Sequence, residues 1–198
     1  MKAIILDMYG VIVKQTGDDF VPYVQQTFPN VSADEIYEPW FRANVGEIPS
    51  LEVWKSIGFQ GDLETIEKDY LDTIELSDGF IDFVEKIRGK YKLAIISNDS
   101  SRWSKYLREK FDINRHFDVI SISGDLKIQK PDERIFLLTI EKLGVNAEDC
   151  IYIDDREGNL EAAKKVGMKT VLLNSRNVSY EGVSVDSFDE LAKEILSI

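Results

Sequence analysis

The sequence predicts an α/β fold in which a doubly wound, mostly parallel sheet carries an additional all-helical segment. Two observations support this fold class. Short apolar runs without polar alternation recur along the chain, which is typical of strands covered on both faces. From residue 79 onward, helical patterns separate these runs, and an alternation of strand and helix favours a parallel sheet.

Apolar runs mark the strand candidates, because they are short and rich in β-branched residues. The four strongest are AIILD at 3–7, KLAIIS at 92–97, CIYID at 150–154 and KTVLLN at 169–174. A weaker candidate, FDVISIS at 117–123, lies between the second and third of these along the chain. The sequence therefore predicts a sheet made of these strands.

Amphipathic patterns predict the helices that connect the strands. They are GFIDFVEKIRG at 79–89, SRWSKYLREKF at 101–111, PDERIFLLTIEKLG at 131–144 and GNLEAAKKVG at 158–167. A last helix begins at Ser187, which with Glu190 makes an S-x-x-E capping box. We therefore expect residues 1–14 and 79–198 to form one Rossmann-like core.

Residues 15–78 break the alternation of strand and helix. Ser32 and Glu35 make another capping box, and apolar residues recur at helical spacing from Leu63 to Ile74. Because this segment follows the first strand directly, it is expected over the carboxyl end of the sheet, where open α/β folds bind ligands. The sequence therefore predicts a helical cap over residues 15–78.

The charge balance argues against two classes of partner. The chain has 198 residues, and its 24 lysines and arginines against 36 aspartates and glutamates give a net charge of -12. Such a chain repels nucleic acid backbones and anionic lipid surfaces. Asp7 also interrupts the apolar stretch at 3–13, which therefore does not resemble a signal peptide. We expect no nucleic acid and no membrane partner, and a cytoplasmic protein.

Scarce residue types exclude several kinds of catalytic site. His116 is the only histidine, so one chain cannot assemble a Ser-His-Asp triad or a zinc site with several histidines. We expect His116 at a helix end or on the surface. Cys150 is the only cysteine and starts an apolar run, so it is expected in the core. Catalysis would then depend on carboxylates, hydroxyls and lysines.

Residues suited to chemistry follow three of the predicted strands. Asp7 ends the run at 3–7, Ser97 and Asn98 stand at the end of the run at 92–97, and Asp154 and Asp155 stand at the end of the run at 150–154. The carboxyl ends of parallel strands share one edge of a sheet, so these residues are expected to converge. Carboxylates gathered in one crevice repel one another unless a cation lies among them. Oxygen ligands favour Mg²⁺, which commonly binds through carboxylates together with substrate phosphate.

The remaining polar residues fit a phosphate ligand. Lys130, which is followed by a helix-starting proline, adds a positive charge to the same edge. Ser97 and the backbone amides around Asn98 can donate hydrogen bonds to phosphate oxygens. Asp7 is then free to act as a nucleophile through an aspartyl-phosphate intermediate.

Four short motifs resemble those of the haloacid dehalogenase superfamily. They are DMYGV, ISN, KPDERIF and YIDDREGN, in this order along the sequence. The resemblance extends over essentially the whole chain. The resemblance implies a hydrolase with a nucleophilic Asp7, a phosphate-binding Ser97 and a charge-neutralising Lys130. It also implies Mg²⁺ held by Asp7, the backbone carbonyl of Tyr9 and Asp154, with Asp155 in support.

A further stretch, NVGEIPSLEVW, resembles the cap of one subgroup of that superfamily. The subgroup includes sugar-phosphate phosphatases and the phosphatase domain of soluble epoxide hydrolases. This second resemblance implies a small-molecule phosphate ester as the substrate and a cap that selects it.

Tyr9 departs from the phosphatase pattern. Phosphatases of this family usually have a second aspartate two residues after the nucleophile, which protonates the leaving group and then activates water. A phenol with an ordinary pKa of about 10 is a poor proton shuttle near neutral pH. Tyrosine at this position resembles the L-2-haloacid dehalogenases, which need no metal and use an arginine from the cap. Arg42 lies in a suitable position for that arginine.

Tyr9 and the acidic pair therefore favour different reactions. A metal-free dehalogenase has no reason to gather Asp154 and Asp155 near Asp7, since unneeded carboxylates repel. We favour an Mg²⁺-dependent phosphatase, with a 2-haloacid dehalogenase-type hydrolase and a weakly active or inactive binding fold as alternatives. For a phosphatase, Tyr9 would leave the aspartyl-phosphate slow to hydrolyse, unless one of the carboxylates Asp18, Asp19 and Glu47 acts as the base.

Overall fold

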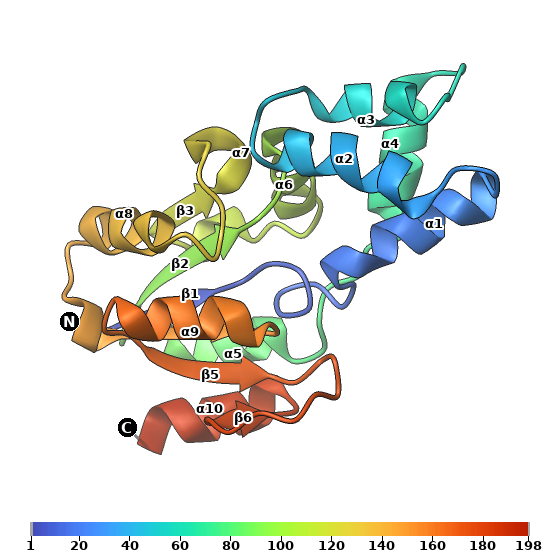
Figure 1. Cartoon of the computed structure of the whole chain (residues 1–198). Coiled ribbons are helices and arrows are strands. Elements are labelled where there is room, and N and C mark those ends of the chain that lie inside the picture. The colour runs from blue at the N-terminus through green and yellow to red at the C-terminus, as the bar shows by residue number, and fades with distance from the viewer. Residues whose placement is uncertain (1, 198) are drawn as a thin grey trace.

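The computed structural model describes residues 2–197, whose centre is a six-stranded sheet (Figure 1). Every pair of neighbouring strands is parallel, in the order β3-β2-β1-β4-β5-β6. The strands are β1 (Ala3–Leu6), β2 (Lys92–Ser97), β3 (Val119–Ile122), β4 (Cys150–Asp154), β5 (Lys169–Leu173) and β6 (Ser184–Val185). The predicted α/β class with a parallel sheet is confirmed.

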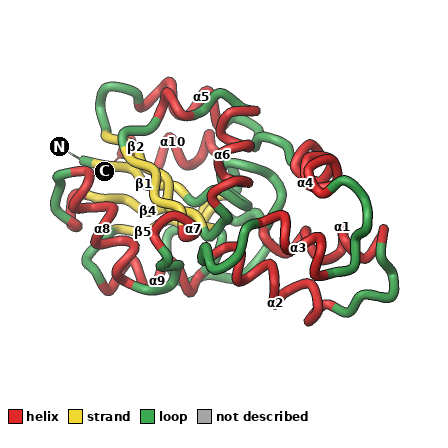
Figure 2. Tube along the Cα trace, turned by 90° about the horizontal axis from the view of Figure 1, so that it is seen from above, coloured by secondary structure: helices red, strands yellow, loops and turns green. Residues whose placement is uncertain are grey.

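Helices cover both faces of this sheet (Figure 2). One face packs against α5 (Phe80–Ile87), α6 (Ser101–Lys110) and α10 (Phe188–Ser197), and the other against α8 (Glu133–Leu143) and α9 (Glu157–Lys165). The residues of β1 alternate between the two cores, and all four are fully buried. Burial on both faces is the reason why the strand sequences lack polar alternation.

Several short elements were not predicted. They are α7 (Ser123–Leu126), the strand β6 and the 3₁₀ helices η1 (Gly17–Asp19), η2 (Asn114–His116) and η3 (Ala147–Asp149). Segments of two to four residues are too short to show a period in the sequence. None of the helices formed by residues 2–197 has the length and apolar character needed to span a bilayer.

The positions expected for His116 and Cys150 have different outcomes. His116 ends a 3₁₀ helix, as one of the expectations had it, but it is buried and does not lie on the surface. Burial lowers its pKa, and neighbouring Arg115 lowers it further. Cys150 is fully buried and unpaired, so its expected place in the core is confirmed.

Four helices lie beyond the carboxyl ends of the strands (Figures 1 and 2). They are α1 (Phe20–Thr27), α2 (Ala33–Asn44), α3 (Ser50–Ser56) and α4 (Leu63–Asp72). No residue from 14 to 75 belongs to a strand. The predicted capping box is present at the start of α2, where Glu35 N–H donates to Ser32 Oγ and Ser32 N–H to the Glu35 carboxylate.

An aromatic cluster joins these four helices to the rest of the molecule. Phe20 lies at its centre, with ring centroids 4.9 to 5.5 Å from those of Trp40, Trp54, Tyr70 and Trp103. Trp103 belongs to α6, which packs against the sheet, so residues of both regions share one continuous core. The four helices are therefore packed onto the strand ends.

Candidate active site

The site lies where the strand order reverses. From β1 the chain continues to β2 and β3 on one side, and then returns to β4 and β5 on the other side. Asp7 follows β1 directly, Ser97 is the last residue of β2, and Asp154 is the last residue of β4. Open α/β sheets bind ligands at such a reversal, because the connections diverge there and leave a crevice.

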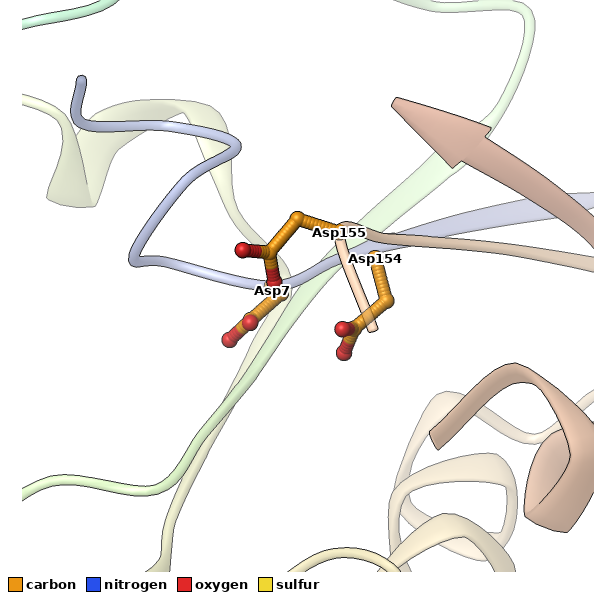
Figure 3. A group of neighbouring side chains, drawn as sticks. All are labelled: Asp7, Asp154 and Asp155. Atoms are coloured by element: carbon orange, nitrogen blue, oxygen red, sulfur yellow. The ribbon is translucent and has the colours of Figure 1, made fainter. Parts of the chain in front are cut away.

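Three carboxylates meet in this crevice (Figure 3). One oxygen each of Asp7, Asp154 and Asp155 lies within 4.8 Å of the others, and all three residues are buried. The convergence that the sequence predicts for these residues is therefore present. Gly10 makes room for it, since a Cβ on Gly10 would lie 2.5 Å from an Asp155 carboxylate oxygen.

Lys130 is the cation of this group. Its Nζ lies 2.6 Å from Asp7 Oδ1 and 2.9 Å from Asp154 Oδ2, and the side chain is almost completely buried. Burial lowers the pKa of Lys130, but the attraction of Asp154 and Asp7 outweighs burial and leaves the pKa raised. Lys130 is therefore protonated and fixed between two carboxylates.

Asn98 holds the backbone of Lys130 in place. The Asn98 side-chain amide donates to the Lys130 carbonyl, and the Lys130 N–H donates to Asn98 Oδ1, both at 2.8 Å. Ser97 lies next to it, and its buried hydroxyl has no hydrogen-bond partner among the described residues. A buried hydroxyl without a partner is costly and is suited to bind an oxygen ligand.

Asp154 and Asp155 have opposite surroundings. Asp154 accepts hydrogen bonds from Lys130, from the Arg156 N–H at 2.8 Å, from the Asn159 amide, and from the Tyr152 hydroxyl. Among the described residues, neither oxygen of Asp155 has a hydrogen bond, and only Arg176 Nε approaches it, at 3.4 Å. Asp155 therefore keeps free acceptor positions inside the crevice.

The shortage of positive charge shows in two pKa values. Burial raises the pKa of Asp7 to about 8, with Lys130 acting against the shift and Asp154 and Asp155 adding to it. Burial and the nearby Asp154 raise the pKa of Asp155 to about 6. Lys130, together with Arg176 at 3.4 Å from Asp155, thus does not balance three carboxylates. The Asp155 oxygens that accept no hydrogen bond and this excess of negative charge fit a divalent cation with oxygen ligands.

Tyr9 extends the site toward the four helices. Its hydroxyl donates to Asp99 Oδ2 at 3.2 Å. Burial, and then Asp99, raise the pKa of Tyr9 well above its ordinary value, so the phenol keeps its proton. Among the described residues, no donor is bonded to the Tyr9 carbonyl oxygen, which leaves it available as the metal ligand that the resemblance implies.

A cavity of about 690 Å³ opens above these groups. Asp7, Lys130 and Asn98 lie at its sheet end, whereas its opposite walls come mainly from α2, α4 and α6. The lining also includes Tyr9, Gly17, Asp18, Tyr37, Glu38, Trp40, Phe41, Arg42, Asn44, Tyr70, Asp99, Trp103, Gln129, Pro131, Arg156 and Asn159. The volume suits a small organic ligand.

Arg42 lines this cavity but already has two partners. Its guanidinium lies 3.3 Å from Glu38 and 3.3 Å from Glu47. Of the carboxylates expected to replace the missing base, Asp18 lines the cavity and pairs with Arg156 and with Arg176. Asp19 instead accepts from the Thr16 N–H at 2.7 Å, and neither Asp19 nor Glu47 is among the lining residues.

The sequence did not single out Asp99, Arg156 or Arg176. Asp99 directly follows Asn98, and Arg156 directly follows Asp155, so their nearness to motif residues is a signal that could have found them. Arg176 lies after β5 outside any motif. Its contact with Asp155 depends on the path of that loop, which no local pattern predicts.

The family model for haloacid dehalogenase-like hydrolases matches residues 1–167. The chain belongs to this family. Among curated proteins, a phosphorylated carbohydrates phosphatase of Thermotoga maritima is 24% identical over 186 residues, covering 86% of this chain and 84% of that protein. The match thus extends over most of both sequences.

Solved structures of the same superfamily share the fold. A HAD phosphatase from Thermococcus onnurineus is 25% identical, with a TM-score of 0.73 over 98% of this chain and 98% of its own. A HAD family enzyme of Bacteroides thetaiotaomicron, in complex with magnesium and inorganic phosphate, is 18% identical, with a TM-score of 0.76 over 91% of this chain and 97% of its own. The architecture described above, including the four additional helices, therefore has close structural counterparts.

Proposed function

We propose that this hydrolase is an Mg²⁺-dependent phosphatase that acts on a small phosphate ester through an aspartyl-phosphate on Asp7. The observation that carries the proposal is the group of three buried carboxylates with one lysine, in which Asp155 has no hydrogen bond among the described residues. The names of the relatives, a phosphatase among the sequences and a magnesium and phosphate complex among the structures, support it.

Each residue of the crevice would have a definite role in this reaction. A carboxylate oxygen of Asp7 attacks phosphorus, the bond from phosphorus to the ester oxygen breaks, and the leaving oxygen takes a proton from solvent, because Tyr9 does not supply one. Water then attacks the phosphorus of the aspartyl-phosphate, releasing inorganic phosphate and restoring Asp7. When bound, Mg²⁺ would be held by Asp7, the Tyr9 carbonyl, Asp154 and Asp155, and would supply positive charge for the phosphate oxygens.

Three further residues would bind the transferred group. Lys130 would give its positive charge to a phosphate oxygen, and the free hydroxyl of Ser97 would donate a hydrogen bond to another. Asn98 would act by fixing the Lys130 backbone, since its side chain is already bonded there. The substrate-binding role expected for Arg42 stays a prediction, because its guanidinium is paired with two glutamates.

The helices of residues 15–78 would act as the cap, over a core of residues 1–14 and 79–198. Their position at the strand ends and their contribution to the cavity walls support this division. The cap would select the alcohol part of the ester, while the core would carry out the phosphate chemistry. The cytoplasm as the compartment also stays a prediction.

The protonated phenol of Tyr9 also fits a second reaction, in which Asp7 attacks carbon as in a dehalogenase. Tyr9 presents a protonated phenol where a proton-shuttling carboxylate would be expected, and dehalogenases that attack carbon need no such group. A halide leaves without a proton, so an aspartyl ester on Asp7 would form with Tyr9 in place. An Asp155 carboxylate that accepts no hydrogen bond and meets only Arg176 has no purpose in that reaction, and for this reason we favour the phosphatase.

Hydrolysis of 4-nitrophenyl phosphate with Mg²⁺, and again with a chelator, tests the proposal. The wild type should be active only with the metal, and Asp7→Asn should lower turnover by a factor on the order of 10⁴ or more. Asp82→Asn, an exposed carboxylate on α5, is the matched control and should keep full activity. Activity that survives in Asp7→Asn or in the chelator would refute the proposal, and release of halide from 2-haloacids would then support the second reaction.

A further inference from the structure

We propose that the ester bound in this cavity carries a cationic amine, such as a quaternary ammonium group, in its alcohol part. The proposal rests on the function proposed above and names the substrate class for it. It concerns the part of the cavity between Asp99 and the aromatic residues of α2, α4 and α6, which the phosphate chemistry does not use.

The positive side chains of the cavity are already engaged. Arg42 pairs with Glu38 and Glu47, and Arg156 Nη2 lies 2.9 Å from Asp18. Lys130 lies between Asp7 and Asp154. Among the described residues that line the cavity, no arginine or lysine is left to bind a second anionic group of the substrate. An additional carboxylate or phosphate on the ester would therefore have to compete with Glu38, Glu47 or Asp18 for an arginine.

Asp99 has the opposite property, because no cationic side chain among the described residues forms an ion pair with it, although Arg108 attracts it from beyond that range. Its side chain is 1% exposed, and its one side-chain partner is the Tyr9 hydroxyl. No lysine, arginine or histidine nitrogen among the described residues lies within 4.0 Å of it. Its backbone is fixed, since the Asp99 N–H donates to Ser123 Oγ and the Gly124 N–H to the Asp99 carbonyl. Burial raises the pKa of Asp99 well above its ordinary value, so a cation that reaches the side chain would favour its ionised form over the protonated one.

Two pairs of aromatic side chains line the same cavity as Asp99. Tyr70 and Trp103 have ring centroids 5.2 Å apart, and Tyr37 and Trp40 form a second pair at 5.9 Å. All four rings line the cavity. Aromatic faces attract cations through their quadrupole, and quaternary ammonium groups are bound in this way. A carboxylate together with aromatic rings therefore matches a soft cation better than it matches a sugar, whose hydroxyls need many hydrogen-bond partners.

The test uses two esters of one shape. Choline phosphate carries a trimethylammonium group, and 3,3-dimethylbutyl phosphate carries a neutral group of the same form. Their inhibition constants against the hydrolysis of 4-nitrophenyl phosphate are measured with Mg²⁺ for the wild type, Asp99→Asn and Trp40→Leu. For each protein we take the ratio of the two inhibition constants. Both esters carry the same phosphate group, so any effect of a variant on phosphate binding cancels in this ratio.

We expect choline phosphate to inhibit the wild type about 10-fold better than the neutral ester, which is the range of cation–π and carboxylate attraction. The ratio should fall toward one in Asp99→Asn and decrease in Trp40→Leu, with thermal unfolding showing that each variant is folded. Equal inhibition of the wild type by the two esters, or a ratio that Asp99→Asn leaves unchanged, would overturn the proposal.

A second measurement separates this proposal from the function on which it rests. If 4-nitrophenyl phosphate is not hydrolysed at all, the phosphatase proposal fails, and calorimetry then compares choline with 3,3-dimethylbutan-1-ol as ligands of the wild type. Preferential binding of choline that is lost in Asp99→Asn would support a cationic ligand for a binding protein. No preference would overturn the cationic ligand as well.

Discussion

Different interactions hold the side chains at the two ends of the cavity. At the sheet end, Asp7, Lys130 and Asp154 hold one another through ion pairs and hydrogen bonds at 2.6 to 2.9 Å. At the cap end, the aromatic rings around Phe20 are held mainly by packing at centroid distances near 5 Å, with one hydrogen bond from Trp103 Nε1 to Glu67 at 2.6 Å. The first end depends on a few exact oxygen and nitrogen positions, and the second on shape and area.

This difference indicates how the work is divided. Charge pairs in a buried crevice are sensitive to every substitution, since one missing partner leaves an uncompensated charge. Aromatic packing tolerates exchange of similar residues with smaller losses. We therefore expect substitutions at the sheet end to change the rate strongly, and substitutions at the cap end to change which ester is bound.

After Asp7→Asn, the largest effect should come from Lys130→Met at the sheet end. The variant leaves Asp7 and Asp154 without their shared cation, so we expect hydrolysis to fall by about 10³-fold or more. The free energy of unfolding of the metal-free protein should fall by roughly 3–5 kcal/mol. Enzyme kinetics and urea denaturation measure the two quantities.

Lys127→Met is the control for that variant, since Lys127 lies in the same connection and is exposed. It should change neither quantity measurably. If the two variants behaved alike, the charge arrangement of the crevice would not control the rate, and the contrast between the two ends would be lost.

A gain of activity should follow from Tyr9→Asp, where the two ends meet. The new carboxylate would supply the general acid and base that a protonated phenol cannot, a change that typically affects rates by about 10²- to 10⁴-fold. Rapid-quench kinetics should show an initial burst of 4-nitrophenol in the wild type, because the aspartyl-phosphate forms faster than it is hydrolysed. The burst should disappear in Tyr9→Asp.

Tyr9→Asp both adds a carboxylate and removes the hydrogen bond from Tyr9 to Asp99. Tyr9→Phe removes only the hydrogen bond, so it should not raise the steady-state rate. A wild type that shows no burst and turns over as fast as Tyr9→Asp would mean that another group replaces the missing carboxylate. Variants of Asp18 would then be tested first, since Asp18 lines the cavity.

The pH dependence of stability provides a smaller effect at the sheet end. The pKa values of Asp7 and Asp155, about 8 and about 6, are raised in the folded protein, so it holds protons that the unfolded chain has released. Between about pH 4 and pH 8 the folded state therefore binds more protons, and stability falls as pH rises through this window. The melting temperature of the metal-free protein should follow this trend.

Mg²⁺ should oppose the decline, because it stabilises the ionised carboxylates, and at 100 times its dissociation constant it adds about 2.7 kcal/mol. Asp155→Asn should flatten the pH dependence near pH 6 and reduce the stabilisation by the metal. Both proteins are compared without metal. The charge balance described here would be contradicted if the melting temperature rose from pH 5 to pH 8 in the wild type but not in Asp155→Asn.

The smallest effect is expected at the cap end, from Arg42→Ala. The guanidinium is exposed and shared between Glu38 and Glu47, so its loss should raise KM by about 3-fold and leave kcat unchanged. Steady-state kinetics with 4-nitrophenyl phosphate measure both. A large fall in kcat would place Arg42 in the chemical step and would favour the dehalogenase-like use of this arginine.

The sequence was informative about the sheet end because its residues follow strand ends. Asp7, Ser97 and Asp154 each follow or end an apolar run, and parallel pairing alone brings such positions to one edge. The helices of residues 20–72 could be predicted as helices, but not the cavity walls that they form. The pairing of Tyr9 with Asp99 joins residues 90 positions apart, and it depends on β1 lying next to β2, with Leu6 opposite Ile95.

The most direct test is to look for phosphate on Asp7. The wild type is mixed with 4-nitrophenyl phosphate and Mg²⁺, quenched in acid during turnover, and digested for mass spectrometry of the peptide that contains residue 7. We predict a phosphorylated Asp7 in the wild type, a smaller amount in Tyr9→Asp because hydrolysis of the intermediate is faster, and none in Asp7→Asn. Turnover that proceeds without phosphate on Asp7 in samples quenched across the time course would contradict the proposed mechanism.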